Sequence, residues 1–214
     1  MTEINVSAHT AYHTQVNNTF FPLSTCNTTS AIMWMLDCGV HFDYPEGMQP
    51  EDHLTQITET PEAHEMMRTL APWAFDSCGR PRYNPREVHV VLAWAVNKLA
   101  GREVMRFRPE ATYQDLVAEL ARGKAALLSG IFTRRGHVVC LVGVRTMQPQ
   151  GELGDAGQVR LDQIKGFYVD DPYGCYFQNY ENSHGNDVYF TFDEIDRLTR
   201  ELYRNCKWAH MYVG

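Results

Sequence analysis

Two apolar segments in the second half of the chain, residues 125–132 and 137–144, are separated by only four residues, Thr133-Arg134-Arg135-Gly136. Their apolar and β-branched side chains predict two central strands. A connection this short joins antiparallel neighbours, because parallel strands need a crossover of about a dozen residues or more. The short connection therefore predicts an antiparallel sheet. Shorter strands are predicted at 104–107, 166–169 and 208–213.

The first half of the chain carries helix signals instead, which are capping residues and apolar runs that end at a glycine. They predict helices over the apolar run 31–36 and over 51–59, 62–71, 84–101 and 112–123, with a late helix that begins after Thr191. Helices followed by an antiparallel sheet indicate an α+β fold rather than a doubly wound one. We expect residues 1–214 to form a single domain, with a helical insertion at about 41–83, where Pro, Glu and His are frequent.

Composition narrows the class of function. With 214 residues, 44 % of them hydrophobic, the chain has the size of one large domain and can bury a sizeable core. A formal charge of −7 disfavours a nucleic-acid partner, because no basic field is present to attract phosphates. No apolar run approaches the ~20 residues of a membrane span, and residues 1–15 lack the features of a signal peptide. We therefore expect a cytoplasmic monomer that acts outside the cell only after release.

Six cysteines occur without a signal peptide and without a C-x-x-C pair, which favours free thiols over a disulfide scaffold or a structural zinc site. Cys26 differs from the others in its position, just ahead of a predicted buried helix. The unpaired N–H groups and the dipole at a helix N-terminus stabilise a thiolate. Cys26 is therefore a candidate nucleophile.

A cysteine nucleophile needs a base within hydrogen-bond reach, and the base needs an orienting acceptor. His137 opens a predicted central strand, and Asp171 ends the next one. If these strands pair antiparallel, the end of one lies beside the start of the other, which brings Asp171 next to His137. Asp170 is the alternative orienting residue, because a shift of one residue exchanges the faces of a strand.

Three segments resemble the bacteriocin-leader, or double-glycine, group of papain-like cysteine peptidases. They are Cys26-Asn27-Thr28-Thr29-Ser30, Gly136-His137-Val138-Val139-Cys140-Leu141-Val142-Gly143 and Tyr168-Val169-Asp170-Asp171-Pro172-Tyr173-Gly174. The resemblance covers most of residues 12–175. It implies a papain-like fold in which N-terminal helices pack on a C-terminal antiparallel sheet.

The resemblance also implies a role for each matched residue. Cys26 would be the nucleophile, His137 the base and Asp171 the residue that orients His137. Gln15 would donate a hydrogen bond to the oxyanion, together with the backbone N–H of Cys26. Asn17 and Asn27 are alternative oxyanion donors.

These residues predict a cysteine peptidase or amidase that needs no metal and no cofactor. Leader peptidases of this group usually precede an export ATPase, and the P-loop pattern of such a module does not occur here. We therefore favour a phage-type lytic enzyme, an endolysin that cuts the stem peptides of peptidoglycan. The alternatives are a peptidase or acyltransferase acting on a protein or leader peptide, and a catalytically silent binding or inhibitor module on the same fold.

Overall fold

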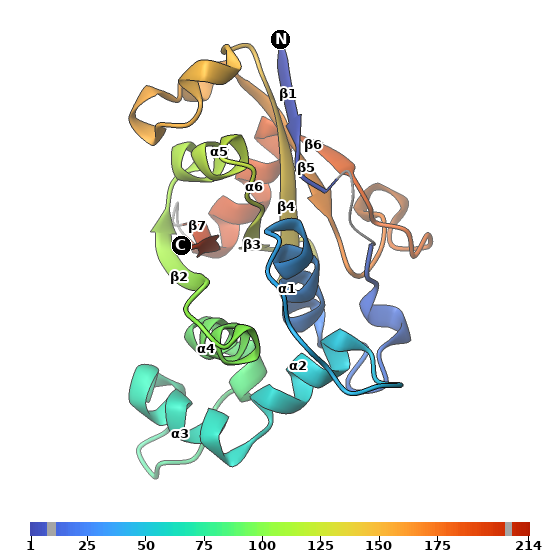
Figure 1. Cartoon of the computed structure of the whole chain (residues 1–214), viewed down its shortest axis with the longest axis vertical. Helices are drawn as coiled ribbons and strands as arrows, with labels where there is room; N and C mark the ends of the chain where they lie inside the picture. The colour runs from blue at the N-terminus through green and yellow to red at the C-terminus, as the bar shows by residue number, and fades with distance from the viewer. Residues whose placement is uncertain (8–11, 204–206) are drawn as a thin grey trace.

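The strands form one antiparallel sheet at the centre of the molecule. The structure is a computed structural model that describes residues 1–7, 12–203 and 207–214. Within these residues the sheet has seven strands in the order β2-β7-β3-β4-β5-β6, with β1 beside β4 (Figure 1). The strands are β1 (Thr2–Asn5), β2 (Met105–Ala111), β3 (Ala126–Gly130), β4 (His137–Thr146), β5 (Ile164–Asp170), β6 (Val188–Thr191) and β7 (Lys207–Tyr212).

β4 is the longest strand and organises the sheet. Along one edge, β3 pairs with residues 137–141 and β1 with residues 143–146, while β5 pairs with residues 140–146 along the other edge. Gly143 lies where β1 approaches closely, since a Cβ there would stand 2.5 Å from the carbonyl oxygen of Ile4. The hairpin predicted from the short turn after residue 132 is thus present as β3 and β4, in antiparallel register.

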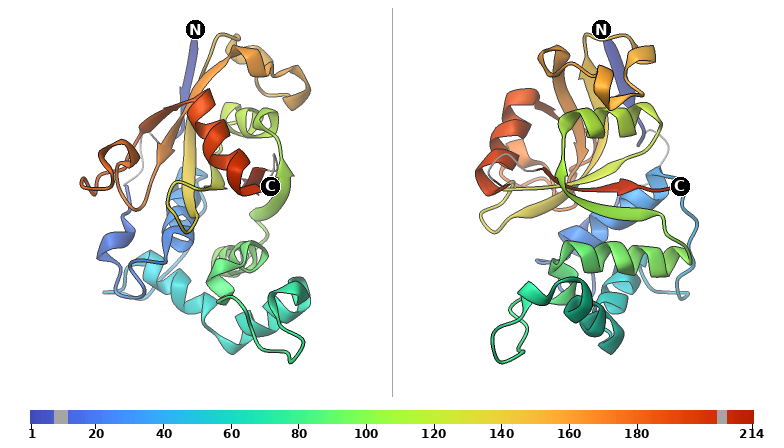
Figure 2. Two further views of the ribbon diagram at one scale, coloured as in Figure 1. Left: turned by 180° about the vertical axis from the view of Figure 1, so that it is seen from behind. Right: turned by 90° about the vertical axis from the view of Figure 1, so that its left-hand side faces the viewer.

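The helices cover both faces of this sheet (Figure 2). They are α1 (Cys26–Asp37), α2 (Pro50–Thr58), α3 (Pro61–Leu70), α4 (His89–Ala100), α5 (Tyr113–Ala121) and α6 (Phe192–Tyr203). Val138 and Cys140 of β4 pack in the core that α1 and α4 share, whereas Val139 and Leu141 pack in the core of α5 and α6. A strand that is buried on both faces has a continuous run of apolar residues instead of an alternating pattern, which explains why most residues of β4 are apolar.

α1 is tied to this central sheet by two buried hydrogen bonds. Ser30 Oγ donates to the carbonyl of Val138 at 2.9 Å, and Trp34 Nε1 donates to the carbonyl of Ala125 at 2.8 Å. The side chains at 31–35 are all buried, as expected for a helix that is apolar on every side. The helix that begins at Cys26 is therefore fixed against the strand that begins at His137.

Residues 41–83 supply α2 and α3, close to the positions that the sequence predicts. α3 and the start of α4 enclose a small core of their own at one end of the molecule (Figure 1). Its buried residues are Ala63, Met67, Ala71, Ala74, Val88 and Val91. The description of this segment as an insertion stays a prediction.

The predicted elements differ from the observed ones in three places. Asn84 and Glu87 form the expected capping box, but it closes a 3₁₀ turn, and α4 begins only at His89 because Val88 is extended. β1 and β6, of four residues each, have no counterpart in the prediction. The loop 146–160 contains short 3₁₀ turns. The α+β class, with helices packed on an antiparallel sheet, is confirmed.

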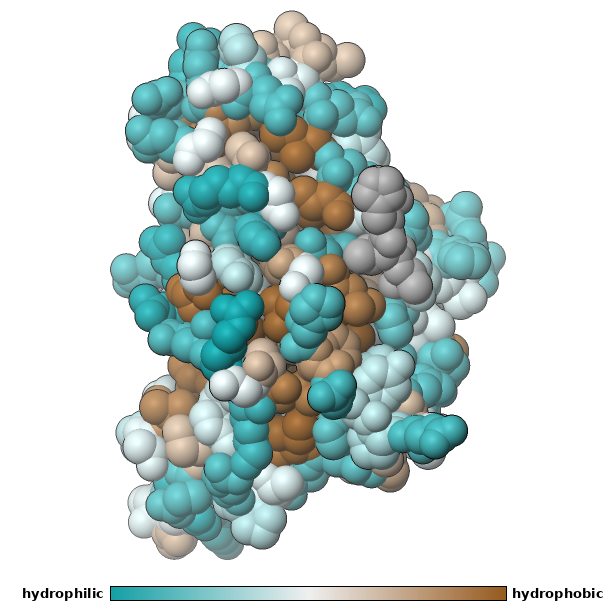
Figure 3. Space-filling model, viewed as in Figure 1, coloured by the Kyte–Doolittle hydropathy of each residue, from teal (hydrophilic) through white to brown (hydrophobic). Residues whose placement is uncertain are grey.

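The surface alternates between polar and apolar side chains. On the face shown in Figure 3, apolar side chains emerge in small separate areas along the middle of the molecule, with polar groups between them. No helix in the described part of the chain has both the length and the apolar character needed to span a membrane.

Candidate active site

The loop before α1 is held in place by buried polar side chains. The amide of Asn18 donates to the hydroxyls of Thr25 and Thr29, each at 2.9 Å. Asp52 accepts hydrogen bonds from two backbone N–H groups of the same loop, each at 3.0 Å. α1 begins directly after this loop, and the side chain of its first residue, Cys26, is half-buried. The candidate nucleophile is thus fixed at a helix N-terminus, where a thiolate is favoured.

The sheet brings the candidate base and its orienting residue together. β4 begins at His137 and β5 ends at Asp170, and because Cys140 pairs with Asp170 the start of one strand lies beside the end of the other. Nε2 of His137 lies 2.7 Å from Oδ1 of Asp171, and both side chains are buried. The same oxygen accepts a hydrogen bond of 2.9 Å from the backbone N–H of Tyr173.

Cys26 and His137 interact directly. Burial raises the pKa of the Cys26 thiol, but the charge of His137, with hydrogen bonds from its ring and from the Val138 N–H, lowers that pKa overall. Burial lowers the pKa of His137, but Asp171 and Cys26 outweigh it through their charges and hydrogen bonds and raise that pKa to about 10. Between the two pKa values the pair exists as thiolate and imidazolium, the reactive form of a cysteine nucleophile.

Asp170 points away from this pair. Its Oδ1 accepts a hydrogen bond of 2.7 Å from the backbone N–H of Asp187. Burial and the nearby charges of Asp187 and Asp37 raise the pKa of Asp170 to about 7, against that hydrogen bond. Adjacent residues of a strand point to opposite faces, so the register that places Asp171 against His137 directs Asp170 to the other side.

Gln15 is buried beside the turn that follows β5. Its backbone N–H donates to the carbonyl of Pro172 at 2.8 Å, which joins the N-terminal segment to the turn that contains Asp171. Its side-chain Nε2 donates to the carbonyl of Pro22 at 2.9 Å, and among the described residues Oε1 has no hydrogen-bond partner. One of the two hydrogens of this amide is therefore used by Pro22.

The two alternative oxyanion donors are placed differently from each other. Asn17 is exposed, and its carbonyl accepts a hydrogen bond from Gln49. Asn27 is buried in the first turn of α1, where its Oδ1 accepts from the backbone N–H of Thr28 at 3.0 Å. The assignment of the oxyanion donor stays a prediction for Gln15, Asn17 and Asn27.

Several tyrosines that the sequence did not single out contact the site. Tyr12 donates from its hydroxyl to the backbone carbonyl of Asp171, and the hydroxyl of Thr14 donates to the carbonyl of Pro172 at 3.0 Å. The rings of Tyr173 and Tyr180 lie 6.2 and 6.3 Å from that of His137. Tyr12 and Tyr180 come from loops without periodicity, so no local signal marked them, whereas Tyr173 lies in one of the three segments that carry the resemblance.

The described cysteines, which are Cys26, Cys38, Cys78, Cys140 and Cys175, are free thiols. Cys206 lies outside the described residues. In residues 1–7, 12–203 and 207–214, no group of three or more His, Cys, Asp or Glu side chains is arranged to hold a metal ion.

Iodoacetamide is expected to alkylate Cys26 at least about tenfold faster than Cys38 or Cys140 at about pH 6. The lowered pKa of Cys26 keeps part of it as thiolate there, whereas burial raises the pKa of both Cys38 and Cys140. The rate at Cys26 should fall as the pH drops through its lowered pKa. Peptide mapping by mass spectrometry measures each site. The His137→Ala variant should slow labelling of Cys26 and leave the exposed Cys78 unchanged; equal rates at Cys26 in both proteins would contradict the ion pair.

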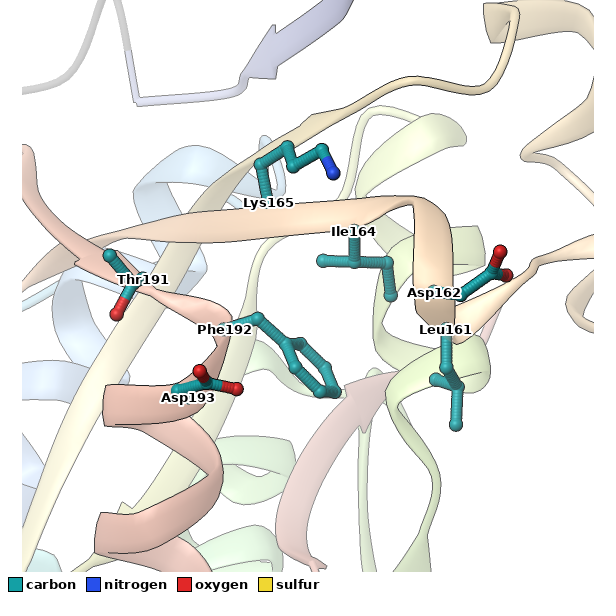
Figure 4. A pocket seen from close by; sticks show the side chains of 7 residues that line it. All are labelled: Leu161, Asp162, Ile164, Lys165, Thr191, Phe192 and Asp193. Carbon is teal, nitrogen blue, oxygen red and sulfur yellow. The ribbon is translucent and has the colours of Figure 1, made fainter.

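A separate hollow of about 410 Å³ lies where β5 and the start of α6 meet (Figure 4). Its lining residues are Leu161, Asp162, Ile164, Lys165, Thr191, Phe192 and Asp193. None of the candidate catalytic residues lines this hollow.

Comparison with known proteins supports the fold. No protein-family model matches the chain, and no curated protein matches it. A Bacillus anthracis protein, provisionally described as a C39-like peptidase, has a solved structure that matches 100 % of this chain and 98 % of its own. The two have a TM-score of 0.58 and 13 % sequence identity. At this identity the likeness is one of fold, and the chain has the α+β fold of that C39-like structure.

Proposed function

We propose that the protein is a cysteine peptidase or amidase. The observation that carries the proposal is the arrangement of Cys26 at a helix N-terminus, in contact with His137, which is hydrogen-bonded to the buried Asp171. A nucleophile, a base and an orienting group in this order are the components of covalent acyl transfer. The fold shared with a C39-like peptidase structure is consistent with this chemistry.

The reaction would follow from these positions. The Cys26 thiolate attacks the carbonyl carbon of the substrate, and the C=O electron pair moves to the oxygen. As the oxyanion collapses, His137 gives its proton to the leaving nitrogen and the C–N bond breaks. Since Nε2 of His137 is held by Asp171, Nδ1 is the nitrogen that gives the proton. Water then attacks the thioester carbonyl while the neutral His137 takes its proton. The C–S bond breaks, which releases the acid and restores the Cys26 thiolate and the charged His137.

The oxyanion would be held by the backbone N–H of Cys26 and by the free hydrogen of the Gln15 amide. Donors of this kind contribute about 3–4 kcal/mol each to transition-state stabilisation where they have been measured. The remaining hydrogen on Gln15 Nε2 supports this role, because the other one is already used by Pro22. No metal or organic cofactor takes part in these steps.

For the substrate, we propose the stem peptides of peptidoglycan, which an endolysin would cut. Arg134 and Arg135 are exposed in the turn that leads into His137, and within the described residues neither forms an ion pair. Stem peptides carry free carboxylates, which arginine binds through paired hydrogen bonds. In a chain of net charge −7, these two residues supply positive charge beside the proposed site.

Incubation of the protein with purified bacterial cell walls tests this proposal, with mass mapping of the released fragments. Fragments cut within the stem peptide, absent with a Cys26→Ala control, would support it. If the walls stay intact while a protein substrate is cleaved, the enzyme is a peptidase of another class. If added amines are incorporated into the product, acyl transfer replaces hydrolysis. If neither the cell walls nor a protein substrate is cleaved, the result favours a catalytically silent binding module.

Reversing the charge of Arg134 and Arg135 to Glu should lower kcat/KM for stem peptides about tenfold and leave a neutral peptide unaffected. The physical reason is the loss of attraction to substrate carboxylates, so the effect should shrink as salt is added. Arg102→Glu is the control, because it makes the same change of charge as each single substitution, at an exposed position after α4. An equal loss on the neutral peptide would show that the double variant disturbs His137 itself.

A further inference from the structure

Tyr180 stands between the two turns that deliver the candidate base and its orienting residue. Its hydroxyl lies 3.0 Å from the carbonyl oxygen of Phe132 and 3.3 Å from Oδ2 of Asp171. Phe132 belongs to the connection that leads from β3 to His137, and Asp171 follows β5. The one hydrogen of this hydroxyl thus has two acceptors within reach, one in the segment before His137 and one on the residue that orients His137.

The two carboxylate oxygens of Asp171 differ in their hydrogen-bond donors, and the Tyr180 hydroxyl serves the second oxygen. Oδ1 already accepts from His137 Nε2 and from the Tyr173 N–H. Among the described residues, the Tyr180 hydroxyl is a donor within hydrogen-bond distance of Oδ2. A hydroxyl has one hydrogen to donate, and an ionised carboxylate is a stronger acceptor than a neutral carbonyl. Tyr180 therefore donates to Asp171 whenever that carboxylate is charged.

The ring of Tyr180 lies beside the hydrogen bond that it supports. Its centroid is 6.3 Å from that of His137 and 5.0 Å from that of Tyr173. His137 and Asp171 are both nearly inaccessible, with 5 % and 0 % of their surface exposed. The partly buried ring of Tyr180 thus lies next to a pair of side chains that are almost closed to solvent.

The backbone of this loop adopts an unusual conformation to place the ring. Asn179 and Tyr180 have φ angles of 50° and 62°, in the left-handed region that residues with a Cβ rarely adopt. Tyr180 is kept there by a hydrogen bond of 3.1 Å from its N–H to the carbonyl of Cys175. Strained backbone persists where the surroundings fix it, and it is concentrated at functional sites.

We propose that Tyr180 is a positioning residue, which tethers Asp171 by a hydrogen bond from its hydroxyl and shelters the His137–Asp171 hydrogen bond from water. The inference rests on the proposed function, because it assigns Tyr180 to the same site. Tyr180 touches neither the substrate nor the reacting atoms and acts through Asp171. Its hydroxyl holds the carboxylate in place, and its ring keeps the bond dry.

Nuclear magnetic resonance of the His137 ring tests this role without any substrate. In the wild type, the proton on Nε2 should exchange slowly with water and the ring should stay charged into alkaline solution. The charged or titratable groups that face the ring are Asp171 and Cys26, with the hydroxyls of Tyr173 and Tyr180 near them. In Tyr180→Ala, water should reach the His137–Asp171 hydrogen bond, so the Nε2 proton should exchange at least about tenfold faster than in the wild type.

Tyr180→Phe keeps the ring and removes the tether, so it separates the two roles and stays informative if the alanine variant fails to fold. We expect its Nε2 proton to exchange at least about threefold faster than in the wild type, and its kcat to fall with little change in KM. Phe177→Ala is the matched control, since it removes a ring from the same loop that contacts Tyr176 and Phe190 rather than Tyr180 or His137.

Two outcomes would overturn the positioning role. One is a folded Tyr180→Ala protein whose Nε2 proton on His137 exchanges as slowly as in the wild type. The other is a Tyr180→Phe protein with an unchanged proton exchange rate. These measurements also distinguish failure of the positioning role from failure of the proposed peptidase function. A wild-type protein that cleaves no peptide but shows the expected changes at His137 would refute the peptidase and leave the tether in place.

Discussion

Replacing Cys26 with alanine is expected to lower kcat/KM for peptide hydrolysis by at least about 10⁴-fold, as removal of a covalent nucleophile does in other hydrolases. The thiolate forms the bond to the substrate carbonyl, and no other described cysteine contacts His137. The fold should survive, because the side chain is half-buried and small. The measurement is steady-state cleavage of the substrate found in the cell-wall assay.

The matched control for this variant is Cys78→Ala, which removes an exposed thiol in the loop between α3 and α4. It should retain wild-type activity. Both variants should unfold within about 2 °C of the wild type, as expected where little packing is lost. Substantial hydrolysis by a well-folded Cys26→Ala protein would remove the basis of the proposed mechanism.

Asp171→Asn is expected to lower kcat/KM by at least about 100-fold, since an amide in place of the carboxylate of a catalytic triad has a cost of this order or greater. The amide keeps the shape of the side chain but removes the charge that holds His137 as imidazolium. The pKa of His137, which Asp171 raises, should fall accordingly. The alkaline limb of the activity profile should therefore move to lower pH.

Asp170→Asn makes the same chemical change one residue earlier and serves as the control. Asp170 faces Asp187 and Asp37 instead of His137, and its pKa of about 7 means that it is already partly neutral. We expect its activity to stay within about threefold of the wild type, in line with a small local change. A reversed result, with Asp170→Asn inactive and Asp171→Asn active, would mean that the other carboxylate orients the histidine.

The elements with local signals were predictable from the sequence. The capping box of Thr112 with Asp115 starts α5, and the one of Thr191 with Glu194 starts α6. The apolar run in α1 ends before Gly39, whose φ of 68° suits glycine. These signals act over three or four residues, so they can be read without knowledge of the fold.

The contacts that complete the site could not be predicted in this way. Tyr12 and Tyr180 reach Asp171 from opposite ends of the chain, and neither belongs to a periodic segment. β1 is short, and its place beside β4 depends on Gly143, far along the sequence. The hydrogen bond from the Gln15 amide to the carbonyl of Pro22 likewise depends on how the loops pack.

Local sequence signals predict that Cys26 lies at the start of a helix, that His137 begins a central strand and that an aspartate ends the next strand. Caps, glycines and apolar runs act over a few residues, so these features can be predicted without the fold. That Asp171 rather than Asp170 is hydrogen-bonded to His137 is known from the tertiary structure alone. That choice depends on strand register, and a shift of one residue reverses the face of every side chain. Register is set by the two cores on either side of β4, which are formed by residues from the whole chain.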